Sequence, residues 1–176
     1  GEGVSVSCGR GNWLSLFSFG LFGNGDAGKV SVTDCLNQYF EPEQLNGSDK
    51  YFCENCHDLE ESTKQLSFLR LPEVMTLHIK RFRFDSYFGA MHQGTKISDH
   101  VDFPLAALDM GPFTKAANGT SKPQLYDLMA VVEHKGGYQG GHYVAYVQME
   151  GSWFEYDDTR VKQISEEEVL AREGYM

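Results

Sequence analysis

One histidine and two aspartates frame a pair of predicted strands toward the end of the sequence. His142 begins an apolar, strand-like run, and a second run over residues 153–156 ends at the paired acids Asp157 and Asp158. A short turn containing Gly151 separates the two runs. This pattern predicts a β-hairpin in which the start of the first strand lies beside the end of the second. We therefore expect His142 and Asp157 to be neighbours, an arrangement in which a carboxylate orients an imidazole that takes the proton of a thiol or hydroxyl.

A glycine-rich stretch, 136–141, precedes this histidine. Glycine accepts backbone angles closed to other residues and lets a second chain approach the backbone closely, so we interpret the stretch as a loop that admits a narrow peptide. The alternative is a surface hairpin in which the histidine and the acids have no joint role. The long ordered series of glycine loop, histidine, aromatic strand, turn, tryptophan and double acid favours a site.

Two cysteines, Cys53 and Cys56, are separated by two residues. Thiolates at this spacing can bind one tetrahedral zinc ion, but a single pair supplies only half of the ligands. The other sulfur donors are Cys8 and Cys35, and His57 is too close to Cys56 to be an easy fourth ligand. We interpret Cys35 as a buried, reduced core thiol rather than a nucleophile. The alternative for Cys53 and Cys56 is a degenerate knuckle that binds no metal.

The sequence resembles the ubiquitin-specific proteases, the papain-like cysteine peptidases that remove ubiquitin. The runs GGHYVAYV and WFEYDDTRV are similar to the histidine and aspartate boxes of that family, LPEVMTLHIKRF is similar to a strand motif, and KYFCENC is similar to its zinc-ribbon CxxC. The motifs occur in family order over about residues 31–175. The family's nucleophile box, a glycine-rich turn with Asn and then Cys-Tyr or Cys-Phe, does not occur in these 176 residues.

The resemblance implies an α+β fold of the papain-like type with thumb, palm and fingers. Residues 31–176 would form a partial catalytic domain that gives most of the palm and part of the zinc-ribbon fingers, and residues 1–30, rich in glycine and aromatic side chains, would be an insertion or linker. The implied reaction is thiol-dependent hydrolysis of the isopeptide bond after the C-terminal glycine of ubiquitin. His142 would act as the base, Asp157 would orient it, and Asp158 would order the oxyanion side. Asp157 is the first of the paired acids after the aromatic run, as in the family pattern, and Asp158 is the alternative for the orienting role.

The resemblance also implies the partners of this chain. The nucleophilic cysteine would come from sequence outside it, in the N-terminal half of the same catalytic domain, and structural zinc would bind Cys53 and Cys56 with two ligands from outside the chain. Ubiquitin and ubiquitinated proteins would be the substrates. The residues expected to bind substrate are Gly136, Gly137, Tyr138, Gly140, Gly141, Tyr87 and Phe88.

Composition limits the classes of partner. The formal net charge is −10, which disfavours nucleic acid and anionic membranes and suits a basic protein surface. No apolar run approaches the roughly 20 residues of a membrane span. We expect a cytoplasmic protein of a reducing compartment, with the nucleus as an additional location to be tested. Two other hypotheses are a non-catalytic ubiquitin-binding scaffold and a zinc-ribbon interaction domain with an incidental His–Asp pair.

Local patterns predict the elements that position these residues. Ser31 and Asp34 predict the start of a short helix, and Ser165 with Glu168 predicts a capping box that begins another. Predicted strands cover 62–70, 71–84 and 125–133, the last leading to His134, which we place in a loop.

Overall fold

The computed structural model describes residues 3–6, 29–84, 94–115 and 122–176. Most of the predicted N-terminal insertion, as well as Tyr87 and Phe88, lies outside the described residues. Neither α-helix in the described part of the chain is long and apolar enough to cross a membrane.

Strands dominate this mixed fold, and most of them pair antiparallel, in agreement with the predicted α+β class. In chain order the elements are β1 (Gly3–Val6), β2 (Val30–Ser31), α1 (Val32–Tyr39), β3 (Glu43–Leu45), η1 (Gly47–Asp49), β4 (Tyr51–Cys53), β5 (Asp58–Glu60), β6 (Ser62–Lys64), β7 (Thr76–Ile79), β8 (Phe82–Phe84), β9 (Gly94–Lys96), β10 (Val101–Asp102), β11 (Leu108–Asp109), η2 (Gly111–Phe113), β12 (Leu125–Tyr126), β13 (Ala130–Gly137), β14 (Gly140–Met149), β15 (Ser152–Asp157), β16 (Arg160–Ile164) and α2 (Glu166–Leu170).

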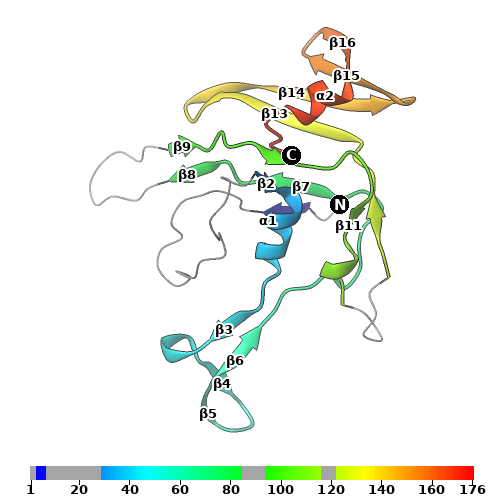
Figure 1. The fold of residues 1–176 in the computed structure, drawn as a ribbon. Coiled ribbons are helices and arrows are strands. Elements are labelled where there is room, and N and C mark those ends of the chain that lie inside the picture. The colour runs from blue at the N-terminus through cyan, green and yellow to red at the C-terminus, as the bar shows by residue number, and fades with distance from the viewer. Residues whose placement is uncertain (1–2, 7–28, 85–93, 116–121) are drawn as a thin grey trace.

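The largest sheet has the order β13-β14-β15-β16, with every pair antiparallel. Alternate residues of β14, Val144 and Tyr146, are fully buried. They form a core with Trp153 of β15 and with Val169 of α2, which lies against the sheet in Figure 1. The predicted capping box begins α2, since the Ser165 hydroxyl accepts from the backbone N–H of Glu168, whose carboxylate accepts in return.

A second core surrounds α1. Ser31 caps this helix as predicted, with Asp34 completing a capping box, and the inner face carries the buried residues Val32, Cys35 and Leu36. Cys35 is 1% exposed, which confirms its predicted burial. It is disulfide-bonded, however, so the prediction of a reduced thiol was wrong. Sequence spacing does not show which sulfurs approach one another in space.

The C-terminal residues join the large sheet to β7. The backbone N–H of Tyr175 donates to the carbonyl of Val132 at 2.7 Å, and the N–H of Ile79 donates to the carbonyl of Tyr175 at 3.0 Å. Figure 1 accordingly shows the chain end between β13 and β7. Residues that are far apart in the sequence therefore meet directly beside the strand that precedes His142.

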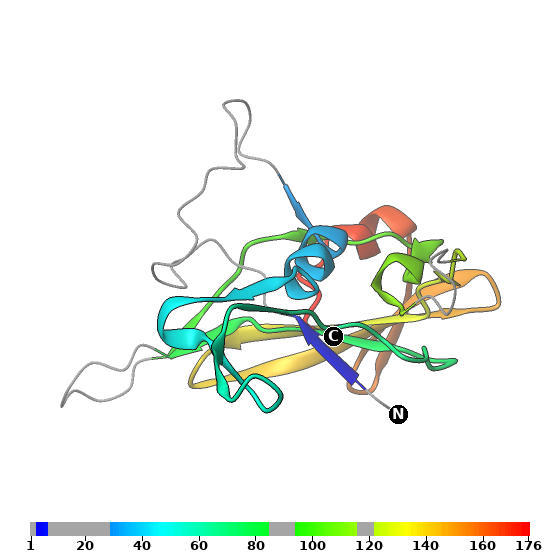
Figure 2. The ribbon, with the colours of Figure 1, turned by 90° about the horizontal axis from the view of Figure 1, so that it is seen from below.

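The strands predicted over 62–70 and 71–84 are shorter than expected. Regular pairing is limited to β6, β7 and β8, and the break between β7 and β8 occurs where the Arg81 side chain turns inward to bind backbone carbonyls. The predicted strand over 125–133 is likewise divided between β12 and β13. Figure 1 shows β3 to β6 as an arm that extends away from α1 and the large sheet, and Figure 2 shows the same arm from below.

Candidate active site

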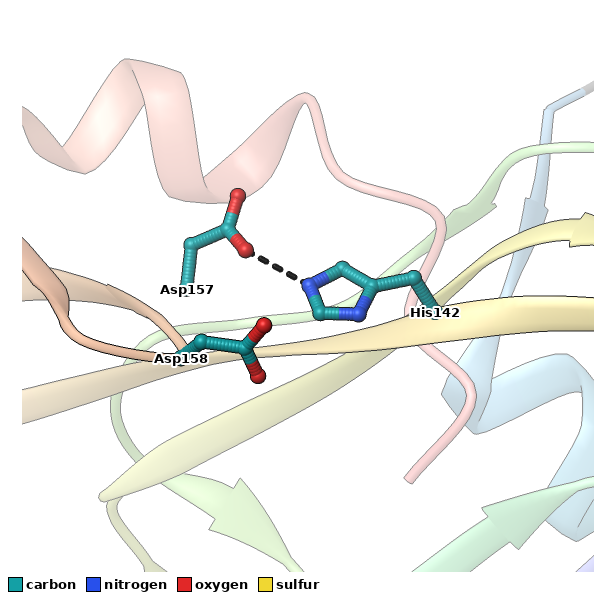
Figure 3. A group of neighbouring side chains, drawn as sticks. All are labelled: His142, Asp157 and Asp158. Atoms are coloured by element: carbon teal, nitrogen blue, oxygen red, sulfur yellow. Dashed lines mark hydrogen bonds and ion pairs between the residues drawn. The ribbon is translucent and has the colours of Figure 1, made fainter.

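His142 and Asp157 are in contact, as the hairpin pattern predicted. The Nε2 atom of His142 lies 2.6 Å from Oδ1 of Asp157 (Figure 3). An ionised carboxylate can only accept, so this bond places a proton on Nε2. In the neutral ring, Nδ1 is then the unprotonated nitrogen that can accept a proton from another group. We call these two residues the His–Asp pair.

The register of the sheet brings the pair together. Ala145 pairs with Tyr156, so Val144 lies opposite Asp157. His142 precedes Val144 by two residues and therefore shares a face with it and with Asp157. Both side chains stay accessible, with 43% of His142 and 39% of Asp157 exposed. The pair thus lies at the open end of a face whose other end is the buried core.

Asp158 occupies the turn between β15 and β16 and has a left-handed backbone with φ 51°. Aspartate tolerates this region better than most residues. Polar side-chain atoms of His142, Asp157 and Asp158 all lie within 4.8 Å of one another, and Figure 3 shows the Asp158 carboxylate beside the imidazole, apart from the Asp157 bond. The structure therefore brings together all three residues expected to be catalytic.

The sequence predicted a glycine-rich loop over 136–141, but these residues form the end of the β13–β14 hairpin. Gly136 pairs with Gly141 and Gly137 pairs with Gly140, because strand pairing satisfies backbone groups that a loop would leave to water. Gly137, Tyr138 and Gly140 line a cavity of about 430 Å³. The remaining lining residues are His78, Lys80, Arg81, Phe82, His134, Tyr143 and Tyr175.

His134 was placed in a loop from the sequence, and this was wrong. It lies in β13 with 6% of its surface exposed. Its ring contacts the rings of Tyr143, at 4.8 Å between centroids, and Phe82, at 5.4 Å. The sequence pattern of residues 130–132 could have been extended through His134 to predict a longer strand. The aromatic neighbours of His134, however, come from β14 and β8, and local sequence patterns do not show that these strands lie beside it.

Gly141 leaves the space that His134 fills. A Cβ atom at this position would lie 2.3 Å from Nε2 of His134 and 2.5 Å from the backbone oxygen of Lys135. We expect Gly141→Ala to destabilise the protein by about 1–3 kcal/mol, which lowers Tm by about 2–4 °C per kcal/mol for a domain of this size. A thermal melt of the full-length protein measures this.

Gly137→Ala is the matched control, because a Cβ atom at Gly137 would meet nothing within 4 Å. Its Tm should equal that of the wild type. Equal losses in the two variants would show that the hairpin, rather than the contact between Gly141 and His134, is sensitive to alanine.

Cys53 and Cys56 lie at the end of β4 and in the turn that leads to β5, and both are free thiols. Hydrogen bonds from the backbone of Cys56, from its side chain and from the backbone of Asn55 lower the pKa of Cys53. Backbone amides that support a thiolate suit metal binding. Within the described residues, no third His, Cys, Asp or Glu completes a ligand set around these two thiols.

The geometry thus defines a site in which a carboxylate holds a histidine at the exposed end of an antiparallel sheet. The profile of the family described as ubiquitin carboxyl-terminal hydrolase matches residues 24–176, and the chain belongs to this family. The resemblance to the ubiquitin-specific proteases is confirmed.

Solved structures of the SAGA DUB module are similar to this chain. The Ubp8/Sgf11/Sus1/Sgf73 module bound to ubiquitin aldehyde matches with a TM-score of 0.74 and 27% identity, covering 98% of this chain and 34% of that chain. The module bound to monoubiquitin matches with a TM-score of 0.70 and 32% identity, covering 85% and 32%. A structure of the yeast module matches with a TM-score of 0.69 and 32% identity, covering 84% and 32%. The chain therefore spans about a third of the length of the chains that it matches.

Proposed function

We propose that this chain is the part of a deubiquitinase catalytic domain that carries the general base and its orienting acid. The observation that carries this proposal is the contact of 2.6 Å between Nε2 of His142 and Oδ1 of Asp157, in a chain of the ubiquitin carboxyl-terminal hydrolase family. The bond fixes the ring and leaves Nδ1 to receive the proton of a nucleophile. The similar modules bound to ubiquitin aldehyde and to monoubiquitin support ubiquitin as the substrate.

In the proposed reaction, Nδ1 of His142 takes the proton of a cysteine thiol supplied by sequence outside this chain. The thiolate attacks the carbonyl carbon of the C-terminal glycine of ubiquitin, and the tetrahedral intermediate collapses as His142 returns the proton to the leaving lysine amine. Water then hydrolyses the thioester with the same histidine as base. Asp157 stabilises the imidazolium that forms, and Asp158 helps to order the oxyanion side.

The large sheet would be part of the palm, and the arm of β3 to β6 would be part of the fingers. The arm is rich in acids, with seven Asp or Glu between residues 41 and 61, namely Glu41, Glu43, Asp49, Glu54, Asp58, Glu60 and Glu61. Together with the net charge of −10, this favours a basic partner surface. The hairpin end, with Gly136, Gly137, Tyr138, Gly140 and Gly141, would lie along the ubiquitin tail.

A ubiquitin that carries a C-terminal thiol-reactive group tests the function in the full-length protein. We expect a covalent adduct on a cysteine that lies outside this sequence, located by peptide mass spectrometry. Binding of ubiquitin without an adduct would instead support a non-catalytic scaffold. An adduct on Cys53 or Cys56 would contradict the proposed mechanism, because neither thiol lies at the His–Asp pair.

Zinc is the proposed structural cofactor. Its Lewis acidity would have no part in the reaction, and Cys53 and Cys56 would supply two of its four ligands, the other two coming from outside the chain. The hydrogen bonds that lower the pKa of Cys53 support this assignment. We expect Cys53→Ser to lower the zinc content of the full-length protein by about one ion per molecule, measured by elemental analysis. Equal zinc in Cys53→Ser and in the wild type would contradict it, and Ser48→Ala, on the same arm, is the control.

A further inference from the structure

A cluster of polar side chains lies behind the His–Asp pair, on the same covered face of the sheet. Its centre is Tyr146, which is fully buried and donates its hydroxyl to Oε2 of Glu133 at 2.6 Å. Burial and this bond both raise the pKa of Tyr146, so the phenol stays a neutral donor. Tyr146 follows His142 by four residues on β14 and therefore points to the same side of the sheet.

Arg172 closes the cluster from the segment after α2. Its guanidinium carbon lies 5.1 Å from the centre of the Tyr146 ring, and its NH2 atom lies 3.7 Å from Oε2 of Glu155. The two charged side chains are largely shielded, with 28% of Arg172 and 21% of Glu155 exposed. A planar cation that stacks on an aromatic ring and pairs with a carboxylate fixes both partners.

Glu155 links this contact to the His–Asp pair. It pairs with Tyr146 across β14 and β15 and precedes Asp157 by two residues, so both carboxylates project from the same face of one strand. Residues two positions apart on a strand are spaced by about 7 Å, so the carboxylates of Glu155 and Asp157 repel each other. A nearby cation offsets this repulsion. Arg172 is the cation that contacts Glu155.

The other charged groups around the pair come from neighbouring strands. Lys162 is the register partner of Glu155 on β16 but forms its ion pair with Glu168, at 3.5 Å. Other charged groups near the cluster or the pair are Arg160 opposite Asp157, Lys135 opposite His142, Asp158 in the adjoining turn, and Glu133, 3.9 Å from the Lys135 amine. Arg81 also interacts with Glu133, and Glu168 with Arg172.

We propose that Arg172 is a positioning residue for the His–Asp pair: by stacking on Tyr146 and neutralising Glu155, it fixes the two strands that carry His142 and Asp157 and balances the charge beside them. The catalytic part of this inference rests on the proposed function. The charge link between Arg172 and His142 does not, and it is measured separately.

Nuclear magnetic resonance follows the imidazole signals of His142, assigned by their absence in His142→Ala, as the pH of the full-length protein is changed. Removing the positive charge in Arg172→Gln leaves Glu155 unpaired and favours a protonated imidazole. The midpoint of the titration should therefore rise by about half a pH unit at low salt. Glu155→Gln should move the midpoint the other way.

Two further variants separate charge from simple loss of structure. Arg172→Lys keeps the charge and should keep the midpoint of the wild type, and the double variant Arg172→Gln/Glu155→Gln should return it toward that value. A midpoint that is unchanged in both Arg172→Gln and Glu155→Gln overturns the inference. If Arg172→Gln does not fold, Glu155→Gln alone decides, since an unmoved midpoint there overturns it as well.

The pH profile of kcat/KM for ubiquitin hydrolysis completes the test. Both limbs should move to higher pH in Arg172→Gln, because added negative potential favours protonation of every group in the site. A wild type that hydrolyses no ubiquitin conjugate would contradict the proposed function and with it the contribution of Arg172 to catalysis through the His–Asp pair. The imidazole titration would still decide whether the charge link exists.

Discussion

His142→Ala should reduce the kcat of ubiquitin hydrolysis by the full-length protein about a thousandfold or more. Its imidazole is the group that the Asp157 carboxylate orients, and no other histidine among the described residues forms a group with two acids within 4.8 Å. Proton transfer by a positioned base contributes about 10²–10⁴ to the rate of many enzymes. The loss should fall on kcat rather than on KM, because the ring acts on the reacting atoms more than on the bound ubiquitin.

The chain offers a matched control for this variant. His100 also pairs with an acid, with its Nε2 atom 3.1 Å from Oδ1 of Asp102, and its side chain is 36% exposed. Exposed ion pairs of this kind contribute about 0–1 kcal/mol to stability, so His100→Ala should leave kcat within about twofold of the wild type. A similar loss in both variants would mean that histidine removal disturbs the fold, and a fully active His142→Ala would remove the basis of the proposed mechanism.

The His–Asp pair could be predicted because it depends on local rules. A two-strand pattern with a short turn fixes which residues lie side by side, and the side-chain period of two fixes their common face. His142 and Asp157 needed no information beyond the stretch between them. Ser31 and Ser165 were predicted for the same reason, since a helix cap is read from residues three positions apart.

The surroundings of the pair could not be predicted in this way. The ring of His134 is buried by Tyr143 on the next strand and by Phe82 on β8, and only the folded chain brings β8 beside the large sheet. Lys96 shows the same limit, since its amine donates to the carbonyl of His134 and pairs with Glu173 at 3.6 Å. The first contact joins residues 38 positions apart and the second joins residues 77 positions apart, and the periodicity of a helix or strand does not predict contacts over such separations.

The lengths of the strands were the second feature that the sequence could not predict. The run Leu71–Phe84 has the composition of one continuous strand, yet pairing stops between β7 and β8. Strand propensity describes how well a residue suits a half-buried pleated surface. It does not tell which backbone groups will form hydrogen bonds with distant segments. At this break the Arg81 side chain donates to the backbone carbonyls of residues 97, 99 and 174, and local sequence does not predict these contacts.

Arg81→Met should lower the free energy of unfolding by about 3–5 kcal/mol, because a buried acceptor that loses its donor costs about 1–3 kcal/mol and Arg81 serves several of them. Only 1% of Arg81 is exposed. Its Nε atom donates to the carbonyl of Gly174 at 2.8 Å, and NH1 donates to those of Asp99 at 2.7 Å and Ile97 at 3.1 Å. Methionine fills a similar volume but leaves all three carbonyls without their donor. Denaturation of the full-length protein with urea, followed by tryptophan fluorescence, measures the change.

Lys80→Met is the control, because Lys80 is the preceding residue, carries the same charge and is exposed. Its free energy of unfolding should change by less than about 0.5 kcal/mol. Arg81→Lys should recover only part of the loss, since one ammonium group at the end of a flexible stem does not reproduce the fixed fork of a guanidinium. Equal stabilities of Arg81→Met and Lys80→Met would contradict the assigned role.

Hydrogen exchange should locate the effect of Arg81→Met. The N–H of Ile79 is protected by the carbonyl of Tyr175, and the N–H of Val132 by the carbonyl of Met176. Both bonds depend on the C-terminal segment that Arg81 holds through Gly174, so both amides should exchange faster in the variant. Val132 pairs with Ala145 on the strand that carries His142. The buried Arg81 guanidinium would thus support the geometry of the His–Asp pair, because it holds the C-terminal segment that bonds to β13, the strand next to the one that carries His142.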